Sequence, residues 1–187
     1  MEILGYTQLR MPGDPAGVPG PNGWDRTFEF QVLNGFAYAS HGSTGGAGRG
    51  GFSIVDVRNP TDMKAIFRHV NDAPDNSQYI DIKDHILVQK RNSSIVMWDV
   101  RNPFAPVRLS SFTPPGIVLT RASDPASPNA HGSFGYHGIW VHLDDRGGRY
   151  VYTSVRLEDY TDQILVIVDI TNPMTPYEIG RWWYPGM

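Results

Sequence analysis

The residues best suited to chemistry are histidines that gather in one segment of the chain. His131, His137 and His142 stand close together, and Tyr136 directly precedes the middle one. An imidazole exchanges protons near neutral pH, and a neighbouring phenol can donate a proton. These residue types predict acid/base chemistry, with His137 and Tyr136 as candidate catalytic residues. The other interpretations are a purely structural role for His137 and aromatic packing for Tyr136.

An arginine and several polar side chains are candidates for holding a small-molecule substrate. Arg26 precedes a predicted strand, where a guanidinium can bind a carboxylate or phosphate through two N–H groups. The competing interpretation of Arg26 is an ion pair with Asp25 or Glu29. With Arg26 as the third catalytic candidate, the predicted reaction is of the lyase, hydratase or isomerase type. The candidate substrate-binding residues are Gln78, Arg121, His131 and His41.

A repeated sequence motif identifies the elements that must position these side chains. At three places an aspartate is followed, three residues on, by Asn-Pro, and the copies end at Pro60, Pro103 and Pro173. The prolines stand 43 and 70 residues apart. A period in the low forties with several strands per period is typical of the blades of a radial β repeat. In each copy we expect the Asp and Asn side chains to cap nearby backbone amides.

The motif predicts an all-β fold, with three four-stranded blades of a β-propeller. Each copy ends a near-continuous apolar run, typical of a central strand covered on both faces. His137 then lies at the start of the innermost strand of the third blade, at one mouth of a central channel. The insertion that leads into His137 is expected to be a lid over this mouth or a plain surface loop. The predicted segments are an irregular arm at 1–23, blades at 24–72, 76–113 and 136–184, and the insertion at 114–136.

The apolar runs resemble the repeat of a known family. The run from Leu165 to Asp169 spells the pentapeptide of the LVIVD repeat family, and 52–56 and 95–99 are degenerate copies. The resemblance extends over residues 27–182 and implies a β-propeller. Members of that family are usually about twice this length, which implies either a fragment or a split half-ring. Since one fold hosts many activities, the resemblance leaves the function open.

A metal centre is the alternative that the resemblance suggests for His137. Propellers related to the selenium-binding proteins and carotenoid oxygenases place inner-strand histidines around one metal. His142 cannot share such a metal, because five residues of strand separate it from His137 by roughly 16 Å. The matching positions Phe28 and Gln78 offer no good ligand. The sequence therefore assigns no metal ligand beyond His137, and the cofactor is either none or a divalent metal completed by other histidines.

A partner is expected because three blades are fewer than the roughly 4–8 of a closed ring. Trp182 and Trp183 end the last predicted strand, where they would expose an apolar face. The partner that completes the propeller is either a second copy, related by two-fold symmetry, or a complementary chain. The rival functional class is therefore a non-catalytic protein-interaction scaffold.

Composition narrows the other possibilities. The 16 Lys and Arg residues against 19 Asp and Glu residues give a net charge of −3 without a basic run. This balance predicts no nucleic-acid and no membrane partner. The chain has no cysteine, which excludes disulfides, a thiol nucleophile and thiolate metal ligands. The first residues show neither a basic nor an apolar leader segment, so the predicted location is cytoplasmic.

Overall fold

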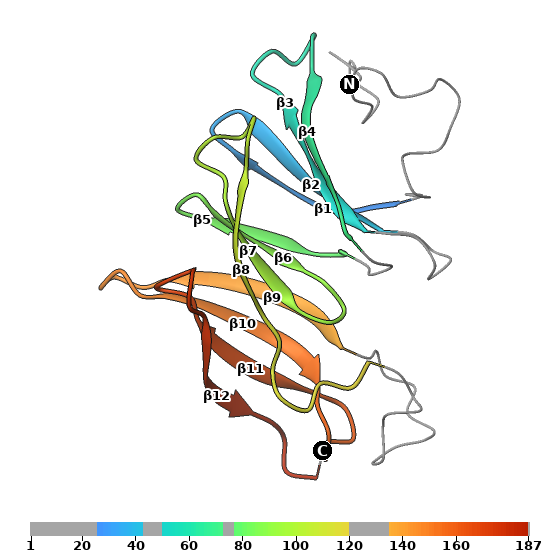
Figure 1. Ribbon diagram of the computed structural model, residues 1–187, viewed down its shortest axis with the longest axis vertical. Helices are drawn as coiled ribbons and strands as arrows, with labels where there is room; N and C mark the ends of the chain where they lie inside the picture. Colours follow the sequence, from blue (N-terminus) through green and yellow to red (C-terminus); the bar gives the residue numbers. More distant parts are fainter. Residues whose placement is uncertain (1–25, 43–49, 73–76, 120–134, 187) are drawn as a thin grey trace. The chain divides into compact units, whose positions relative to one another are not determined.

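Three antiparallel sheets account for all the regular structure in the described part of the chain. The structure, a computed structural model, describes residues 26–42, 50–72, 77–119 and 135–186. Within these ranges it contains twelve strands and no helix, and each four-stranded sheet follows the order of the chain (Figure 1). The predicted all-β fold with three four-stranded blades is therefore confirmed.

Four consecutive strands form each blade. Blade one contains β1 (Arg26–Leu33), β2 (Phe36–Gly42), β3 (Gly51–Asp56) and β4 (Lys64–Val70). Blade two contains β5 (Ile80–Lys83), β6 (Ile86–Lys90), β7 (Ile95–Asp99) and β8 (Val107–Phe112). Blade three contains β9 (Tyr136–Leu143), β10 (Arg149–Arg156), β11 (Gln163–Asp169) and β12 (Tyr177–Trp182). The first strand of each blade, the inner strand, is an edge strand of its sheet.

The chain divides into two compact units. The first unit contains Met1–Ile80 and Val100–Val107, and the second contains Asp81–Asp99 and Arg108–Met187. In the first unit Phe52 packs on Phe67 with ring centroids 5.7 Å apart. Phe36 contacts Phe104 at 5.9 Å. The first contact lies within blade one, and the second joins blade one to the segment Val100–Val107 of the same unit.

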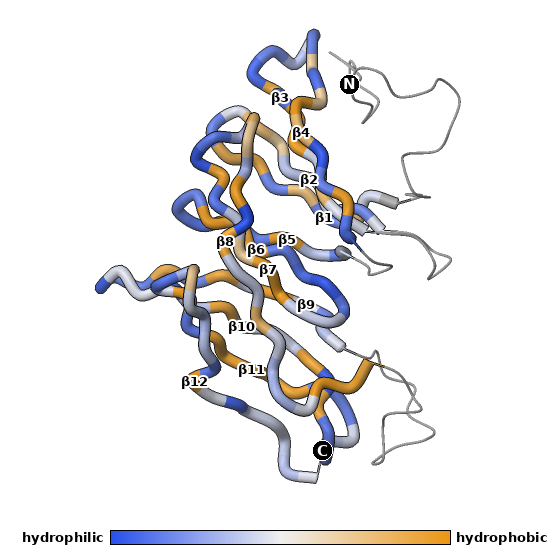
Figure 2. Tube along the Cα trace, viewed as in Figure 1, coloured by the Kyte–Doolittle hydropathy of each residue, from blue (hydrophilic) through white to orange (hydrophobic). Residues whose placement is uncertain are grey.

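The core of the second unit lies between strands of blades two and three. Its buried side chains alternate along β10 and β11, as expected when one face of a sheet is covered. Figure 2 shows hydrophobic stretches along these two strands. The members that carry the argument below are Val88 and Met97 from blade two and Val141, Val151, Val166 and Val168 from blade three.

Two-residue turns join the first and second strands of blades one and two. Asn34 and Gly35 have φ values of 51° and 79°, which is the left-handed pair that a type I′ turn requires. Gly35 also lies against the side chain of Arg58, where a Cβ would collide. In blade two the corresponding residues are Asp84 and His85, with φ values of 47° and 61°. The turn at Asn34-Gly35 is therefore of type I′, and blade two makes the same turn without glycine.

Candidate functional site

Tyr136 and His137 are adjacent at the start of β9, where the first side chain is buried and the second is exposed. Tyr136 is only 1% exposed and belongs to the core, and its hydroxyl donates to the Phe112 carbonyl at 3.3 Å. Burial raises the pKa of the Tyr136 phenol, with a smaller contribution from the charge of Glu178. His137 is exposed, because neighbouring side chains of a strand point to opposite faces. This geometry favours the packing interpretation of Tyr136.

His41 is buried rather than open to a substrate. It is 2% exposed at the end of β2, and its Nε2 lies 2.9 Å from the Ser53 hydroxyl oxygen. Its Nδ1 lies 3.2 Å from the Thr27 hydroxyl oxygen. A serine within hydrogen-bond reach of a histidine is the arrangement of a nucleophile and its base. Because Ser53 is equally buried, we assign the pair a structural role that ties β2 to β3.

Of the remaining candidates, Gln78 alone has its side chain among the described residues. Gln78 is half-buried, and its carbonyl accepts a hydrogen bond from the Ser40 hydroxyl at 2.9 Å. Arg26 begins β1 opposite Gly42, and its side chain lies outside the described residues. Arg121, His131 and the greater part of the insertion also lie outside the described residues.

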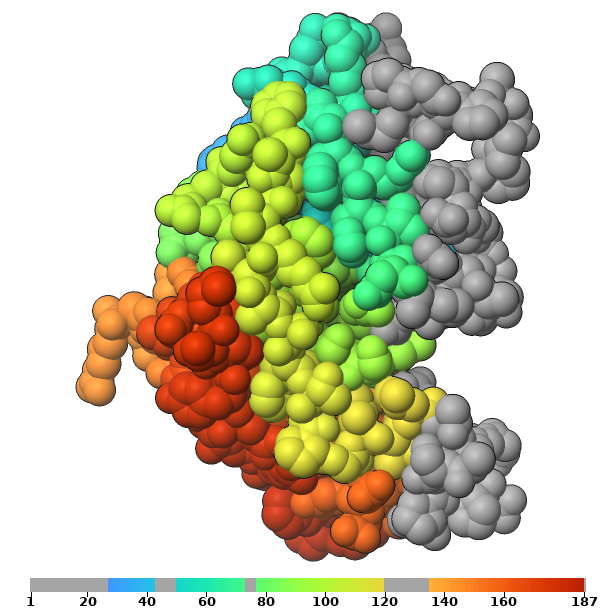
Figure 3. Space-filling view, viewed as in Figure 1, coloured from blue at the N-terminus to red at the C-terminus, as the bar shows by residue number. Residues whose placement is uncertain are grey.

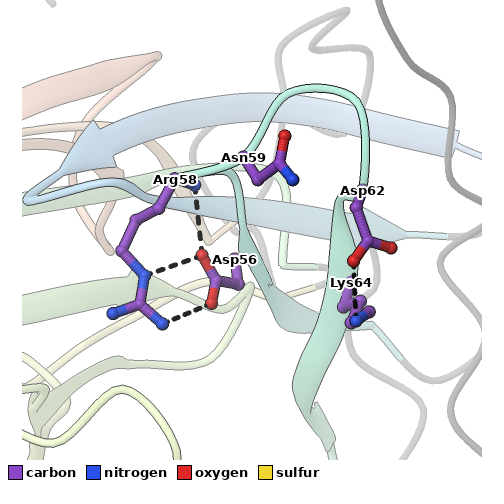
Figure 4. A pocket seen from close by; sticks show the side chains of 5 residues that line it. All are labelled: Asp56, Arg58, Asn59, Asp62 and Lys64. Atoms are coloured by element: carbon purple, nitrogen blue, oxygen red, sulfur yellow. Dashed lines mark hydrogen bonds and ion pairs between the residues drawn. The ribbon is translucent and has the colours of Figure 1, made fainter.

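A depression of about 380 Å³ lies at the turn between β3 and β4 (Figure 4). Arg58 donates two hydrogen bonds to the Asp56 carboxylate, at 2.9 and 2.6 Å. These bonds, together with the Arg58 backbone N–H, lower the pKa of Asp56 to about 2. Asp62 pairs with Lys64 at 2.8 Å. Since both carboxylates are neutralised by their own turn, the depression has the character of a rigid turn and not of a ligand site.

The turn also confirms the predicted role of the repeated motif. Asn59 accepts a hydrogen bond from the Thr61 backbone N–H at 3.1 Å. Asn102 and Asn172 accept the same bond, at 3.1 Å, from the residue two positions on. Asp169 accepts one from the Thr171 N–H at 2.7 Å. These side chains cap backbone amides, which explains why the Asp and Asn recur in each blade.

Neither a metal cluster nor a membrane-spanning helix occurs in the part of the chain that the structure describes. No group of three or more His, Asp or Glu side chains there is placed to hold a metal ion. Likewise, those residues include no apolar helix of membrane-spanning length.

Strand registers match corresponding positions of the blades and extend the exposed surface that the sequence predicts at Trp182. Directly opposed residues of neighbouring strands point to the same face of a sheet. We name the face that carries Tyr38 in blade one, and the matching face of the other blades, the front face. The matched sets are Gln31, Tyr38 and Ile54 in blade one and Trp140, Tyr152 and Ile167 in blade three.

The front face is closed in blades one and two but open in blade three. Tyr38 and Ile54 are buried, as are the blade-two residues at the matching positions, Val88 and Met97. Blade three is different at every one of these positions. There the half-buried side chains are Tyr152, Leu165 and Ile167, and the exposed ones are Trp140 at 63% and Trp182 at 57%. The outer strand β12, which carries Trp182, lies open on the surface (Figure 3).

Comparison with known proteins supports the repeat. The LVIVD repeat model matches residues 46–70 and 148–183, which include β3 and β11. The second copy of the motif lies outside these segments, although its strand β7 is the third strand of its sheet, as β3 and β11 are in theirs. No curated protein matches the chain. The chain therefore carries LVIVD repeats, and its three four-stranded antiparallel sheets are consistent with β-propeller blades.

Proposed function

We propose that this chain is a non-catalytic interaction scaffold that binds another β-blade through the front face of blade three. The observation that supports this function is the contrast between equivalent positions. Tyr38 and Ile54 are buried in blade one, whereas Tyr152 and Ile167 are half-exposed in blade three. Covering a large apolar side chain contributes about 1.5–3 kcal/mol relative to leaving it in water. Several such residues on one face supply enough free energy for a stable complex.

The partner we propose is a second copy of the chain. The front face of blade three needs the back of a blade, and blade one carries an exposed back. Phe30 and Val32, on the inner strand of blade one, are 68% and 59% exposed. At the matching positions of blade two, Ile80 and Ile82 are buried. One chain therefore carries both halves of the interface, and two copies related by a two-fold axis would form it twice.

Acid/base chemistry at His137 is the second candidate. It is favoured by the exposure of His137 at the start of the inner strand β9, where the sequence predicts a channel mouth. Its support is narrower, because the Tyr136 hydroxyl is turned into the core. His137→Ala separates the two candidates. An enzyme would lose turnover on a small anionic substrate with its fold intact, whereas a scaffold would show no such turnover before or after the substitution.

Self-association is the direct test of the scaffold. Native mass spectrometry and sedimentation velocity of the 187-residue chain should show a dimer. Ile167→Asp should shift the equilibrium to monomer, because it places a charge in the centre of the covered face. The matched control is Met174→Asp, at an exposed apolar residue of the turn before β12. A wild-type chain that stays monomeric at high micromolar concentration would refute the proposal, as would equal effects of the two substitutions.

A further inference from the structure

The inner strands β1, β5 and β9 carry different residues at one matched position, which we call the latch level. Two of these residues make a hydrogen bond from their side chain to the backbone of another inner strand. Gln31 follows Phe30, Asp81 follows Ile80 and Trp140 follows Ile139, where the three apolar residues align as the first strands of the blades. The registers support the match, since Gln31 lies opposite Tyr38 and Trp140 opposite Tyr152. The level therefore holds one amide, one carboxylate and one indole.

In the first two blades the side chain at this level reaches the backbone of the following inner strand. The Gln31 side-chain amide donates to the Ile80 carbonyl at 3.3 Å. The Asp81 carboxylate accepts the Val141 backbone N–H at 2.6 Å. Both bonds reach an edge strand of a sheet, β5 or β9, whose outer backbone groups need a partner other than a neighbouring strand. We name this contact the inner-strand latch.

The chemistry of each latch suits the backbone group that it meets. Along a strand, the carbonyl of one residue and the N–H of the residue two positions on point to the same edge. Ile80 of β5 corresponds to Ile139 of β9. Gln31 therefore meets the carbonyl of the first residue of such a pair, and Asp81 meets the N–H of the residue two positions on, Val141. An amide side chain can donate to the carbonyl, and a carboxylate can accept from the N–H. The same edge therefore accepts either type of side chain.

Trp140 stands at the latch level of blade three with its side chain 63% exposed. An indole has one N–H donor and no acceptor, so it can engage only the carbonyl of the pair. Lys83 Nζ lies 5.7 Å from the centroid of the Trp140 ring, a cation–π contact that uses the ring face and leaves the N–H for another partner. Within the described residues, the indole N–H makes no hydrogen bond.

We propose that Trp140 is the third latch and that its indole N–H donates to the Phe30 carbonyl of a second copy. The inference rests on the proposed function and names the bond that fixes the register of that interface. Phe30 stands where Ile80 stands in blade two, and the Ile80 carbonyl is the acceptor that Gln31 uses. The strand β1 is an edge strand like β5 and β9. The occupant of the open face is therefore a blade whose inner strand presents a carbonyl at this level.

The indole N–H gives a direct spectroscopic test. In ¹⁵N-labelled chain, the Trp140 indole signal, assigned by its absence from Trp140→Phe, should move downfield and gain protection from hydrogen exchange as the dimer forms. Trp183→Phe, at an exposed tryptophan that meets Tyr160 edge to face, is the matched control and should change neither the dimer nor the Trp140 signal. An indole N–H that exchanges equally fast in monomer and dimer would overturn the latch.

Affinity of self-association gives the second test. Trp140→Phe keeps an aromatic ring but removes the donor, and should raise the dimer dissociation constant about five- to tenfold. Trp140→Asp should weaken the dimer more than Trp140→Phe, because it sets a carboxylate against a carbonyl. An Asp variant that binds as well as wild type would overturn the assignment of a carbonyl acceptor.

Mixing two variants tests the identity of the partner. Trp140→Asp and Phe30→Asp should each impair both interfaces of a two-fold dimer when studied alone. Mixed together, they should form a heterodimer in which one of the two interfaces carries the native Trp140 and Phe30, so association should partly recover. Failure to recover would exclude a second copy as the occupant. A wild-type chain without any self-association refutes the proposed function, whereas a dimer that is insensitive to Trp140 refutes the latch alone.

Discussion

Blades one and three present the same front-face pattern, yet only one of them is covered. Tyr38 and Tyr152 stand at one matched position, and Ile54 and Ile167 at another. The residue types are identical, whereas the side chains in blade one are buried and those in blade three are half-exposed. The difference shows that the repeat gives both blades the same residue types on the front face, and that these residue types alone do not determine whether the face is buried.

The largest expected effect comes from truncating the two matched isoleucines. Ile54→Ala should lower the free energy of unfolding by about 2–5 kcal/mol, because it leaves a cavity in a fully buried site. Ile167→Ala should cost about 1 kcal/mol in the monomer, because its surroundings are already partly open to water. Urea unfolding of dilute protein measures both values. Equal losses would mean that the front face of blade three is as well covered as that of blade one.

The two latches provide the next comparison. Asp81→Ala should destabilise the second unit by about 1–3 kcal/mol, since the buried Val141 and Ile82 N–H groups both lose their acceptor. Gln31→Ala should cost about 0.5–1.5 kcal/mol, because it removes one neutral bond at a half-buried site.

Asp81→Asn is the control for the carboxylate latch, because it retains an acceptor oxygen of similar shape. Its loss of unfolding free energy should be smaller than that of Asp81→Ala. A larger loss for Gln31→Ala than for Asp81→Ala would show that the bond to Val141 does not hold the blades of the second unit together.

Local patterns made the fold predictable, whereas side chains that act over long range were not predictable. The apolar runs of β3, β7 and β11 and the capping Asp and Asn residues depend on neighbours within a few positions. The burial of Tyr136 depends on which face of β9 meets blade two, and an alternating strand pattern leaves that choice open. The Ser53 partner of His41 comes from another strand, and the Asp81 latch joins residues 60 positions apart. Such pairings require the fold itself.

The two-residue turns of blades one and two sharpen the comparison at smaller energies. His85 holds a φ of 61° without being glycine, so His85→Gly should raise the free energy of unfolding by up to about 1 kcal/mol. Gly35→Ala should lower it by about 1 kcal/mol or more, because its φ is 79° and Arg58 lies where a Cβ would project. Thermal unfolding of both variants checks the opposite signs. A destabilising His85→Gly would mean that the imidazole contacts outweigh the backbone strain.

The smallest effect concerns the repeated motif in blade one, where Arg58 stands at the position of Thr171 in blade three. Arg58 lowers the folded-state pKa of Asp56 to about 2, below its ordinary value of 3.8. A lowered carboxyl pKa means that the pairing stabilises the folded chain above about pH 4 and that this contribution is lost as the pH falls toward 2. Arg58→Thr copies blade three and should return the pKa of Asp56 toward 3.8, as measured by NMR titration of the carboxyl carbon. A value still near 2 would mean that the backbone N–H alone lowers the pKa. The arginine would then be dispensable to the turn, as it already is in blade three.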